Sequence, residues 1–186
     1  MDVLTFSVAS MEKAQPESTL GNFVADACLA MAVKNYKVTD SKEIDFCVLN
    51  NGGLRSSLPQ GNITRKNVFE LMPFENELVV LTLKGSTVTG LLNYISEKGG
   101  VPVSNLKMKI NNGTFTDVMI NENKFDPANN YKVLTSDYLA YGGDAMSVFS
   151  EKDSLEFVNL KVRDAIIYFM ELQDTLKPKL DGRISK

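Results

Sequence analysis

The chain has 186 residues, of which 44% are hydrophobic, and a formal net charge of −3 at pH 7, values that predict one globular domain with a hydrophobic core. Since no basic run offers a continuous path for phosphates, this charge argues against a nucleic-acid-binding surface, although one or two arginines could bind a free nucleotide. The sequence contains no histidine, which excludes Ser-His-Asp and Cys-His triads and di-metal phosphatase centres, and leaves a hydrolase only carboxylates, lysine or tyrosine.

No stretch of about 18 consecutive residues is apolar, so we expect no membrane span. The start, MDVLTFSVAS, lacks the basic and apolar regions of a signal peptide and fits either a cytoplasmic start or a mature chain given a new Met1. Cys28 lies in a helical pattern and Cys47 in an apolar strand. We therefore expect two buried thiols rather than a disulfide or a metal site.

The first predicted elements are a strand and a long helix. Residues 4–8, LTFSV, alternate between apolar and polar, as in a half-buried strand. Gly21 and Asn22 then lie in the first turn of a helix, where they indicate either a loose start or a close approach of the backbone to another group. Ser18 or Thr19 can cap this helix, and its apolar face consists of Leu20, Phe23, Val24, Ala27, Cys28 and Met31.

Two strands and two helices follow. Residues 44–50, IDFCVLN, form a nearly continuous apolar run that is typical of a buried strand. Thr64 can cap a short helix that ends before Pro73. Residues 76–85, NELVVLTLKG, predict another strand. The next segment predicts a helix that ends at Gly99 and buries Val88, Leu91, Leu92 and Ile95.

The second half is richer in strands. Residues 106–133 predict a β-rich region with a hairpin turn at NNG, followed by a strand at YKVLTS. A loop at residues 137–146, a helix within LKVRDAIIYFMELQ and a polar tail, DTLKPKLDGRISK, complete the chain. Because strands and helices are mixed without regular βαβ alternation, the predicted class is α+β, in a single domain that spans residues 1–186.

Three loops combine glycine with polar or aromatic residues. In the first, NNGGLR, Gly52 and Gly53 allow backbone N–H groups to face an anion, and Arg55 adds a permanently charged fork for phosphate or carboxylate. Leu54 is expected to turn inward and anchor the loop. By itself the pattern is more often a tight turn with Arg55 in a surface ion pair.

The second and third loops are residues 72–76 and 138–144. If all three loops converge, Phe74 and Tyr138 could stack on the two faces of a flat ring, an interaction worth on the order of 1–3 kcal/mol per base. Asp144 would then suit a pair of hydroxyls, and Arg55 a phosphate. Taken singly, an aromatic residue beside a proline is usually packing, and Asp144 is an ordinary turn aspartate.

Four motifs in this order, ESTLGNFVADA, NNGGLRSSLPQGNIT, LMPFENELVVLTLKG and YLAYGGDAM, resemble the C-terminal domain of the 5′-nucleotidase / UDP-sugar hydrolase family. The resemblance runs from about Glu17 to Ile184. It implies a layered α/β sandwich, with sheets between helix layers, that holds the substrate. In its usual form such an enzyme also has an N-terminal metallophosphoesterase domain with two divalent metals and a catalytic Asp-His pair.

The resemblance also implies the substrate-binding residues. Asn50 and Arg55 match a polar pair that contacts substrate near its phosphate and ribose. Phe74 and Tyr138 match two aromatics that sandwich the base, and Asp144 matches a carboxylate that accepts hydrogen bonds from the ribose hydroxyls. The expected set, which contains no catalytic and no metal-binding residue, is Asn50, Gly52, Gly53, Arg55, Phe74, Asn76, Tyr138, Gly143 and Asp144.

The sequence departs from the family pattern in four ways. Pro16 stands where an arginine commonly precedes the glutamate of the first motif, so one phosphate-side cation is expected to be missing. Tyr138 replaces a usual phenylalanine, which keeps the ring and adds a hydroxyl. Ala145 replaces the last glycine of a frequent GGDG, so the backbone is expected to differ after Asp144. The metallophosphoesterase half is absent from these residues, in agreement with the lack of histidine.

These observations predict a nucleotide- or nucleoside-recognition domain of a 5′-nucleotidase-type hydrolase that acts in nucleotide catabolism. We expect it to be inactive alone, without a cofactor of its own, and to need a metallophosphoesterase domain or subunit as partner. The alternatives are a stand-alone nucleotide sensor or scavenger, and a degenerate module that binds nothing. The resemblance implies a periplasmic or extracellular location. The base stays open, as does binding of UDP-sugars, because stacking tolerates any base.

Overall fold

The computed structural model describes residues 2–40 and 42–186, and within them strands and helices are mixed along the chain. The predicted α+β class is therefore confirmed. The helices are α1 (Thr19–Asn35), α2 (Arg65–Leu71), α3 (Gly85–Glu97), α4 (Asp137–Ala140) and α5 (Val162–Glu171), with short 3₁₀ turns η1 (Asn51–Gly53), η2 (Gly143–Ala145) and η3 (Ser147–Glu151).

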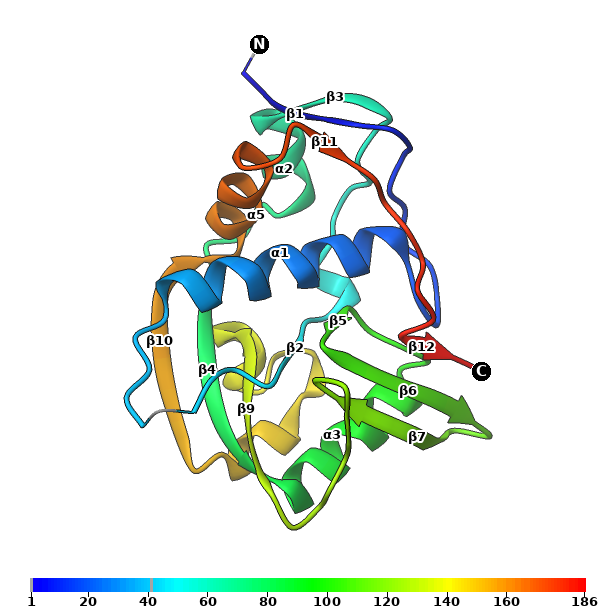
Figure 1. Cartoon of the computed structure of the whole chain (residues 1–186), viewed down its shortest axis with the longest axis vertical. Coiled ribbons are helices and arrows are strands. Elements are labelled where there is room, and N and C mark those ends of the chain that lie inside the picture. Colours follow the sequence, from blue (N-terminus) through cyan, green and yellow to red (C-terminus); the bar gives the residue numbers. More distant parts are fainter. Residues whose placement is uncertain (1, 41) are drawn as a thin grey trace.

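A five-stranded central sheet separates two hydrophobic cores (Figure 1). Its strands are, in spatial order, β10 (Ser154–Lys161), β4 (Glu77–Lys84), β9 (Asn130–Ser136), β2 (Phe46–Val48) and β5 (Val103–Ser104). Since successive side chains of a strand face opposite sides, Val80 and Leu134 pack in one core, whereas Val79 and Val133 pack in the other. Helices α1 and α5 cover the first face and α3 covers the second, which confirms the layered sandwich.

Two smaller sheets flank this centre. One has the order β11 (Thr175–Leu176), β1 (Val3–Ser7) and β3 (Gly61–Thr64), and the other has the order β12 (Ile184–Ser185), β6 (Leu106–Asn111), β7 (Thr114–Ile120) and β8 (Asn123–Lys124). The segment predicted to be a polar tail therefore supplies an edge strand to each sheet. Its Arg183 is buried, and the guanidinium binds the carboxylates of Asp26 and Asp181.

Helix α1 lies between the central sheet and α5, which explains why it is buried on most of its sides and not only on the predicted face. The Ser18 hydroxyl accepts a hydrogen bond from the Gly21 N–H and caps the helix. A Cβ atom on Gly21 would lie 3.3 Å from Pro102 Cγ, so the close-approach interpretation of this glycine is the correct one.

Among the described residues, no helix combines the length and the apolar character that a membrane crossing requires.

The predicted helix boundaries are confirmed at several points. Thr64 caps α2 in a reciprocal pair of bonds with Asn67, because each side chain bonds the other residue's backbone N–H. Helix α3 ends at Glu97 with Lys98 as its C-cap, and Gly99 follows with φ of +72°, a left-handed conformation that favours glycine. The β6–β7 hairpin turns at Asn112 and Gly113, which both have positive φ as a tight two-residue turn requires.

Other elements differ from the sequence prediction. The segment expected to be a loop at residues 137–146 contains α4 and η2. Strand β10 was not predicted, because its register with β4 shifts between Phe157 and Lys161 and Asn159 has a φ of +58°. Such an irregularity breaks the two-residue alternation by which a strand is recognised.

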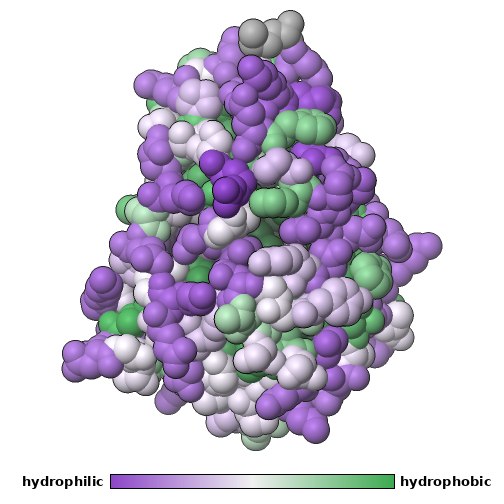
Figure 2. All heavy atoms as spheres, turned by 180° about the vertical axis from the view of Figure 1, so that it is seen from behind, coloured by the Kyte–Doolittle hydropathy of each residue, from purple (hydrophilic) through white to green (hydrophobic). Residues whose placement is uncertain are grey.

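Polar and apolar side chains are segregated as in other globular domains. Cys28 and Cys47 are buried and free, as predicted, and burial raises the pKa of Cys28 to about 12. Seen from behind, the surface is mostly hydrophilic, and its apolar areas are small and separate (Figure 2). The buried hydrophobic residues form the two cores.

Candidate functional site

The three glycine- and aromatic-containing loops converge on one cleft. Its volume is about 290 Å³, near the lower end of the range for small-molecule sites. The cleft is lined by eight of the nine predicted site residues, namely Asn50, Gly52, Gly53, Arg55, Phe74, Asn76, Tyr138 and Asp144. The ninth, Gly143, lies directly behind the Tyr138 ring. The sequence therefore identified residues that are far apart in the chain and adjacent in the fold.

The first loop leaves strand β2 and holds the Asn50 amide against its two glycines. A Cβ atom on Gly52 would lie 3.2 Å from Asn50 Nδ2, and one on Gly53 would lie 3.2 Å from Asn50 Oδ1. Both glycines therefore leave room for the Asn50 side chain. Leu54 is 1% exposed and anchors the loop in the core, as predicted.

Arg55 projects from this anchored backbone with its charge exposed. Its N–H donates to the Leu71 carbonyl oxygen at 2.8 Å, which fixes the backbone, while one guanidinium N–H makes only a long contact of 3.4 Å with the Gly52 carbonyl. Within residues 2–40 and 42–186, no carboxylate lies within 4.0 Å of the guanidinium. The surface ion pair that a lone Gly-Gly-x-Arg pattern indicates is thus not formed.

Asp137 joins the second loop to the third. Its Oδ1 accepts a hydrogen bond from the Glu77 N–H at 3.1 Å and another from the Tyr138 N–H at 2.7 Å. Glu77 follows the cleft residue Asn76, and Asp137 precedes the cleft residue Tyr138. One carboxylate oxygen therefore fixes the spacing between the loops that carry the two aromatic rings.

The residues Phe74 and Tyr138 are 39% and 48% exposed, so both present apolar surface to the cleft and to solvent. A Cβ atom on Gly143 would lie 2.5 Å from two atoms of the Tyr138 ring, which means that the glycine packs tightly behind it. The Asp144 N–H donates to the Tyr138 hydroxyl at 3.2 Å. The hydroxyl that distinguishes Tyr138 from phenylalanine thus supports the third loop.

The backbone at Asp144 and Ala145 has a left-handed conformation. Asp144 has a φ of +55° and Ala145 a φ of +59°. Glycine adopts this conformation without strain, whereas alanine does not. Ala145 therefore occupies a conformation suited to glycine, the residue that a GGDG sequence would have at this position.

The Asp144 carboxylate has a cation beside it. Lys98 Nζ lies 3.3 Å from Asp144 Oδ1, and the Tyr94 hydroxyl donates to the Asp144 carbonyl oxygen at 2.9 Å. Burial, and then the Asp144 charge, raises the pKa of Tyr94, so its hydroxyl remains a neutral donor. The lining of the cleft therefore has one cationic side chain, Arg55, and one anionic side chain, Asp144, and Lys98 lies beside the latter.

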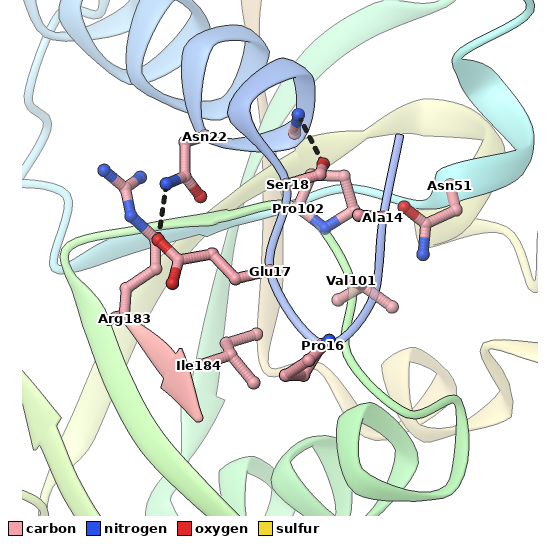
Figure 3. Close-up of a pocket in the computed structure, with 11 residues that line it drawn as sticks. Ala14, Pro16, Glu17, Ser18, Asn22, Asn51, Val101, Pro102, Arg183 and Ile184 are labelled. Atoms are coloured by element: carbon pink, nitrogen blue, oxygen red, sulfur yellow. Dashed lines mark hydrogen bonds between the residues drawn. The ribbon is translucent and has the colours of Figure 1, made fainter. Parts of the chain in front are cut away.

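Pro16 does not line this cleft but a separate, tightly filled hollow near the start of α1 (Figure 3). Arg183 also lines that hollow, but its guanidinium is bound by carboxylates. The Glu17 carboxylate accepts hydrogen bonds from the Asn22 side chain and from the Asp181 and Gly182 N–H groups. The first family motif therefore ties the C-terminal segment to α1.

Three residues that contact the loops of this site were not predicted from the sequence: Lys98, Asp137 and Arg163. Arg163 carried a recognisable signal, because it lies on the same helical stripe as the buried Ile166, Ile167 and Met170. A cation on an apolar stripe needs a buried partner. Lys98 and Asp137 had no such signal, since a lysine at a helix end and an aspartate before an aromatic residue are both common on surfaces.

The chain does not offer the donor set of a di-metal phosphoesterase centre. It contains no histidine, and in the described part of the chain no three acidic or cysteine residues come together as metal ligands. No catalytic step through a metal can therefore be built on these residues.

The sequence is similar to those of several known proteins. The family model for the 5′-nucleotidase C-terminal domain matches residues 2–151. The Bacillus subtilis protein named trifunctional nucleotide phosphoesterase protein YfkN is 29% identical in an alignment of 194 positions that covers 91% of this chain and 12% of that protein. The Escherichia coli protein UshA is 30% identical over 131 residues, which cover 68% of this chain and 24% of that protein.

A solved structure shares the fold over the whole chain. The 5′-nucleotidase precursor from Thermus thermophilus superposes with a TM-score of 0.85 at 24% identity, covering 100% of this chain and 39% of that one. The chain thus spans between about an eighth and two fifths of the length of these relatives.

Proposed function

The chain belongs to the family of 5′-nucleotidase C-terminal domains, and from this premise we propose that it recognises a nucleotide or nucleoside for a 5′-nucleotidase-type phosphoester hydrolase. The hydrolytic step belongs to a metallophosphoesterase domain or subunit outside these 186 residues. Two divalent metals there would supply an activated water and neutralise phosphate charge.

The observation that carries this proposal is the convergence of complementary groups on one cleft. Phe74 and Tyr138 offer apolar ring faces for a base. The Asp144 carboxylate can accept two hydrogen bonds from a ribose diol, and Arg55 has no carboxylate partner among the described residues and is suited to a phosphate. A nucleotide has a base, a ribose diol and a phosphate, and it is therefore the ligand that could use all three kinds of group in the cleft.

In this role the chain binds and orients the substrate and takes no part in bond breaking. The anchored Leu54 and the Asp137 carboxylate hold the loops in place before a ligand arrives. Such preorganisation reduces the entropy lost on binding. It would present the phosphoester to the catalytic partner in a fixed orientation.

Calorimetric titration of the purified chain with adenosine, AMP, a UDP-sugar and ribose 5-phosphate tests the proposal. We expect AMP to bind more tightly than either adenosine or ribose 5-phosphate. Phe74→Ala and Tyr138→Ala should each weaken AMP binding by about tenfold or more, the loss of one stacked base contact. The proposal is wrong if no ligand binds, or if both substitutions leave the affinity unchanged.

Turnover is tested separately, with AMP and added Mn²⁺ or Zn²⁺ in a preparation shown to be free of contaminating phosphatase. We expect none. Hydrolysis by the isolated chain would contradict the assignment of catalysis to a partner, while leaving nucleotide recognition intact.

The proposed location is the periplasm or the outside of the cell, where members of this family usually work. Cell fractionation with an antibody against the chain tests it. The genomic neighbourhood separates a hydrolase component from a stand-alone sensor or scavenger, since a metallophosphoesterase in the same or an adjacent reading frame favours the former.

A further inference from the structure

We propose that Arg163 is a positioning residue that holds the Phe74 ring ready to stack on a base. This inference rests on the proposed function. By this inference, helix α5 fixes the position of the loop that carries Phe74, although no side chain of α5 lines the cleft.

The Arg163 side chain is 8% exposed and reaches from the first turn of α5 into the loop between α2 and β4. One terminal nitrogen donates to the Phe74 carbonyl oxygen at 3.3 Å and makes a longer contact of 3.5 Å with the Met72 carbonyl oxygen. The other terminal nitrogen binds the Glu75 carboxylate. A single guanidinium thus holds three residues of a loop that has no regular secondary structure of its own.

The same guanidinium also packs against an aromatic ring. Its carbon lies 4.2 Å from the centre of the Phe69 ring, which belongs to α2. The N–H of the neighbouring Val162 donates to the Asn76 carbonyl oxygen at 2.9 Å. The first turn of α5 therefore tethers the loop on both sides of Phe74.

The Phe74 ring depends on this tether because packing alone does not hold it. The residue is 39% exposed and belongs to neither hydrophobic core. Its position follows from the backbone to which it is attached, and Arg163 bonds that backbone at Phe74 itself.

The chemistry of Arg163 also argues for a directed role. Its Nε is buried and has no hydrogen-bond partner among the described residues, which is unfavourable for folding. An apolar side chain at position 163, on the same helical stripe as Ile166 and Met170, would leave no buried N–H group without a partner. Arg163 places one terminal nitrogen on a carbonyl oxygen and the other on a carboxylate, whereas a lysine has a single nitrogen for both partners, so lysine is not equivalent here.

The experiment compares Arg163→Lys and Arg163→Met with wild type, using AMP and ribose 5-phosphate as ligands. The second ligand lacks the base and cannot report on stacking. We expect both variants to weaken AMP binding by about tenfold, the scale of one lost stacking contact, with ribose 5-phosphate affinity unchanged. In a Phe74→Ala background the Arg163 substitutions should have no further effect.

Lys161→Ala is the matched control, because Lys161 binds the same Glu75 carboxylate without bonding the loop backbone. It should leave AMP affinity unchanged. Thermal unfolding of every variant separates loss of the tether from loss of the fold.

Three results would overturn the inference: equal losses for AMP and ribose 5-phosphate, an undiminished Arg163 effect without the Phe74 ring, or failure of both Arg163 variants to fold. If Phe74→Ala itself leaves AMP binding intact, the stacking assignment of the proposed function fails instead.

Discussion

The backbone N–H of Asp144 donates a hydrogen bond of 3.2 Å to the hydroxyl of Tyr138. One side chain thus presents a ring to the cleft and also braces the turn that carries the cleft's carboxylate. The two contributions can be separated by substitution, because phenylalanine keeps the ring and lacks the hydroxyl.

Tyr138→Phe should lower the free energy of unfolding by about 1 kcal/mol or less, since one exposed hydrogen bond is lost to water. AMP affinity should stay within about twofold of wild type, because the stacking face remains. Chemical denaturation and calorimetry measure the two effects. If Phe weakens binding as much as Ala does, the hydroxyl rather than the ring contributes the affinity.

Gly143→Ala should weaken AMP binding while leaving stability nearly unchanged. The added Cβ would lie 2.5 Å from the Tyr138 ring, and this half-exposed ring can move away only by changing its position in the cleft. Calorimetry and thermal unfolding test both parts. Unaltered affinity would mean that the ring position observed here does not matter for binding.

Ala145→Gly should stabilise the domain by about 1 kcal/mol, because it relieves the left-handed conformation at φ +59°. For a chain of this length that corresponds to a rise in melting temperature of about 2–4 °C. Ala165→Gly, inside helix α5, is the control and should lower stability by about 1 kcal/mol or more. A lower melting temperature for Ala145→Gly would contradict the prediction.

Arg55→Ala should weaken AMP binding but not adenosine binding, because only AMP has a phosphate for the guanidinium. Arg55→Lys should be intermediate, since it keeps the charge and loses the fork. Arg65 is a matched control: it is an exposed arginine paired with Asp2 and Glu171, outside the cleft. Arg65→Ala should change neither affinity, and equal losses for both ligands in Arg55→Ala would remove the phosphate role.

The contribution of Glu75 to stability should depend on pH. Lys161 and Arg163, through hydrogen bonds to its carboxylate, lower the pKa of Glu75 from an ordinary 4.5 to about 2. A carboxyl whose pKa is lowered in the folded state stabilises that state fully at pH values above the pKa that it has in the unfolded chain. This stabilisation is lost as the pH falls through the lowered pKa. Glu75→Gln should therefore be less stable than wild type at pH 7. The two melting temperatures should converge as the pH falls from the ordinary pKa of 4.5 to the lowered one of about 2, and a constant difference across that range would contradict the assignment.

The sequence predicts what depends on local pattern and on motif order. Thr64 and Gly99 mark helix ends through backbone chemistry that acts over a few residues, and both were found. The cleft residues were found because four weak motifs occur in a fixed order. The order did not reveal Arg163 or Asp137, since their partners, Phe74 and Glu77, lie far away in the chain. Strand β10 was missed because Asn159 interrupts its alternation.

The structure changes the interpretation of Pro16. From the sequence alone we expect this position to lie near the phosphate of a substrate, whereas in the structure Pro16 lines the hollow between α1 and the C-terminal segment. Arg55 is therefore the arginine to examine for phosphate binding, with Lys98 next to Asp144 at the margin of the cleft.

The two edge strands of the C-terminal segment have a consequence for the order of folding. Strand β1 begins at Val3 and gains its second neighbour only from Thr175–Leu176, and the Thr5 hydroxyl donates to the Gln173 carbonyl oxygen. During synthesis the growing chain therefore cannot complete its sheets until the residues of β11 and β12 have left the ribosome. Contacts between such distant residues also slow folding. A nascent chain that stalls before this segment would expose unpaired strand edges, which are targets for chaperones and for aggregation.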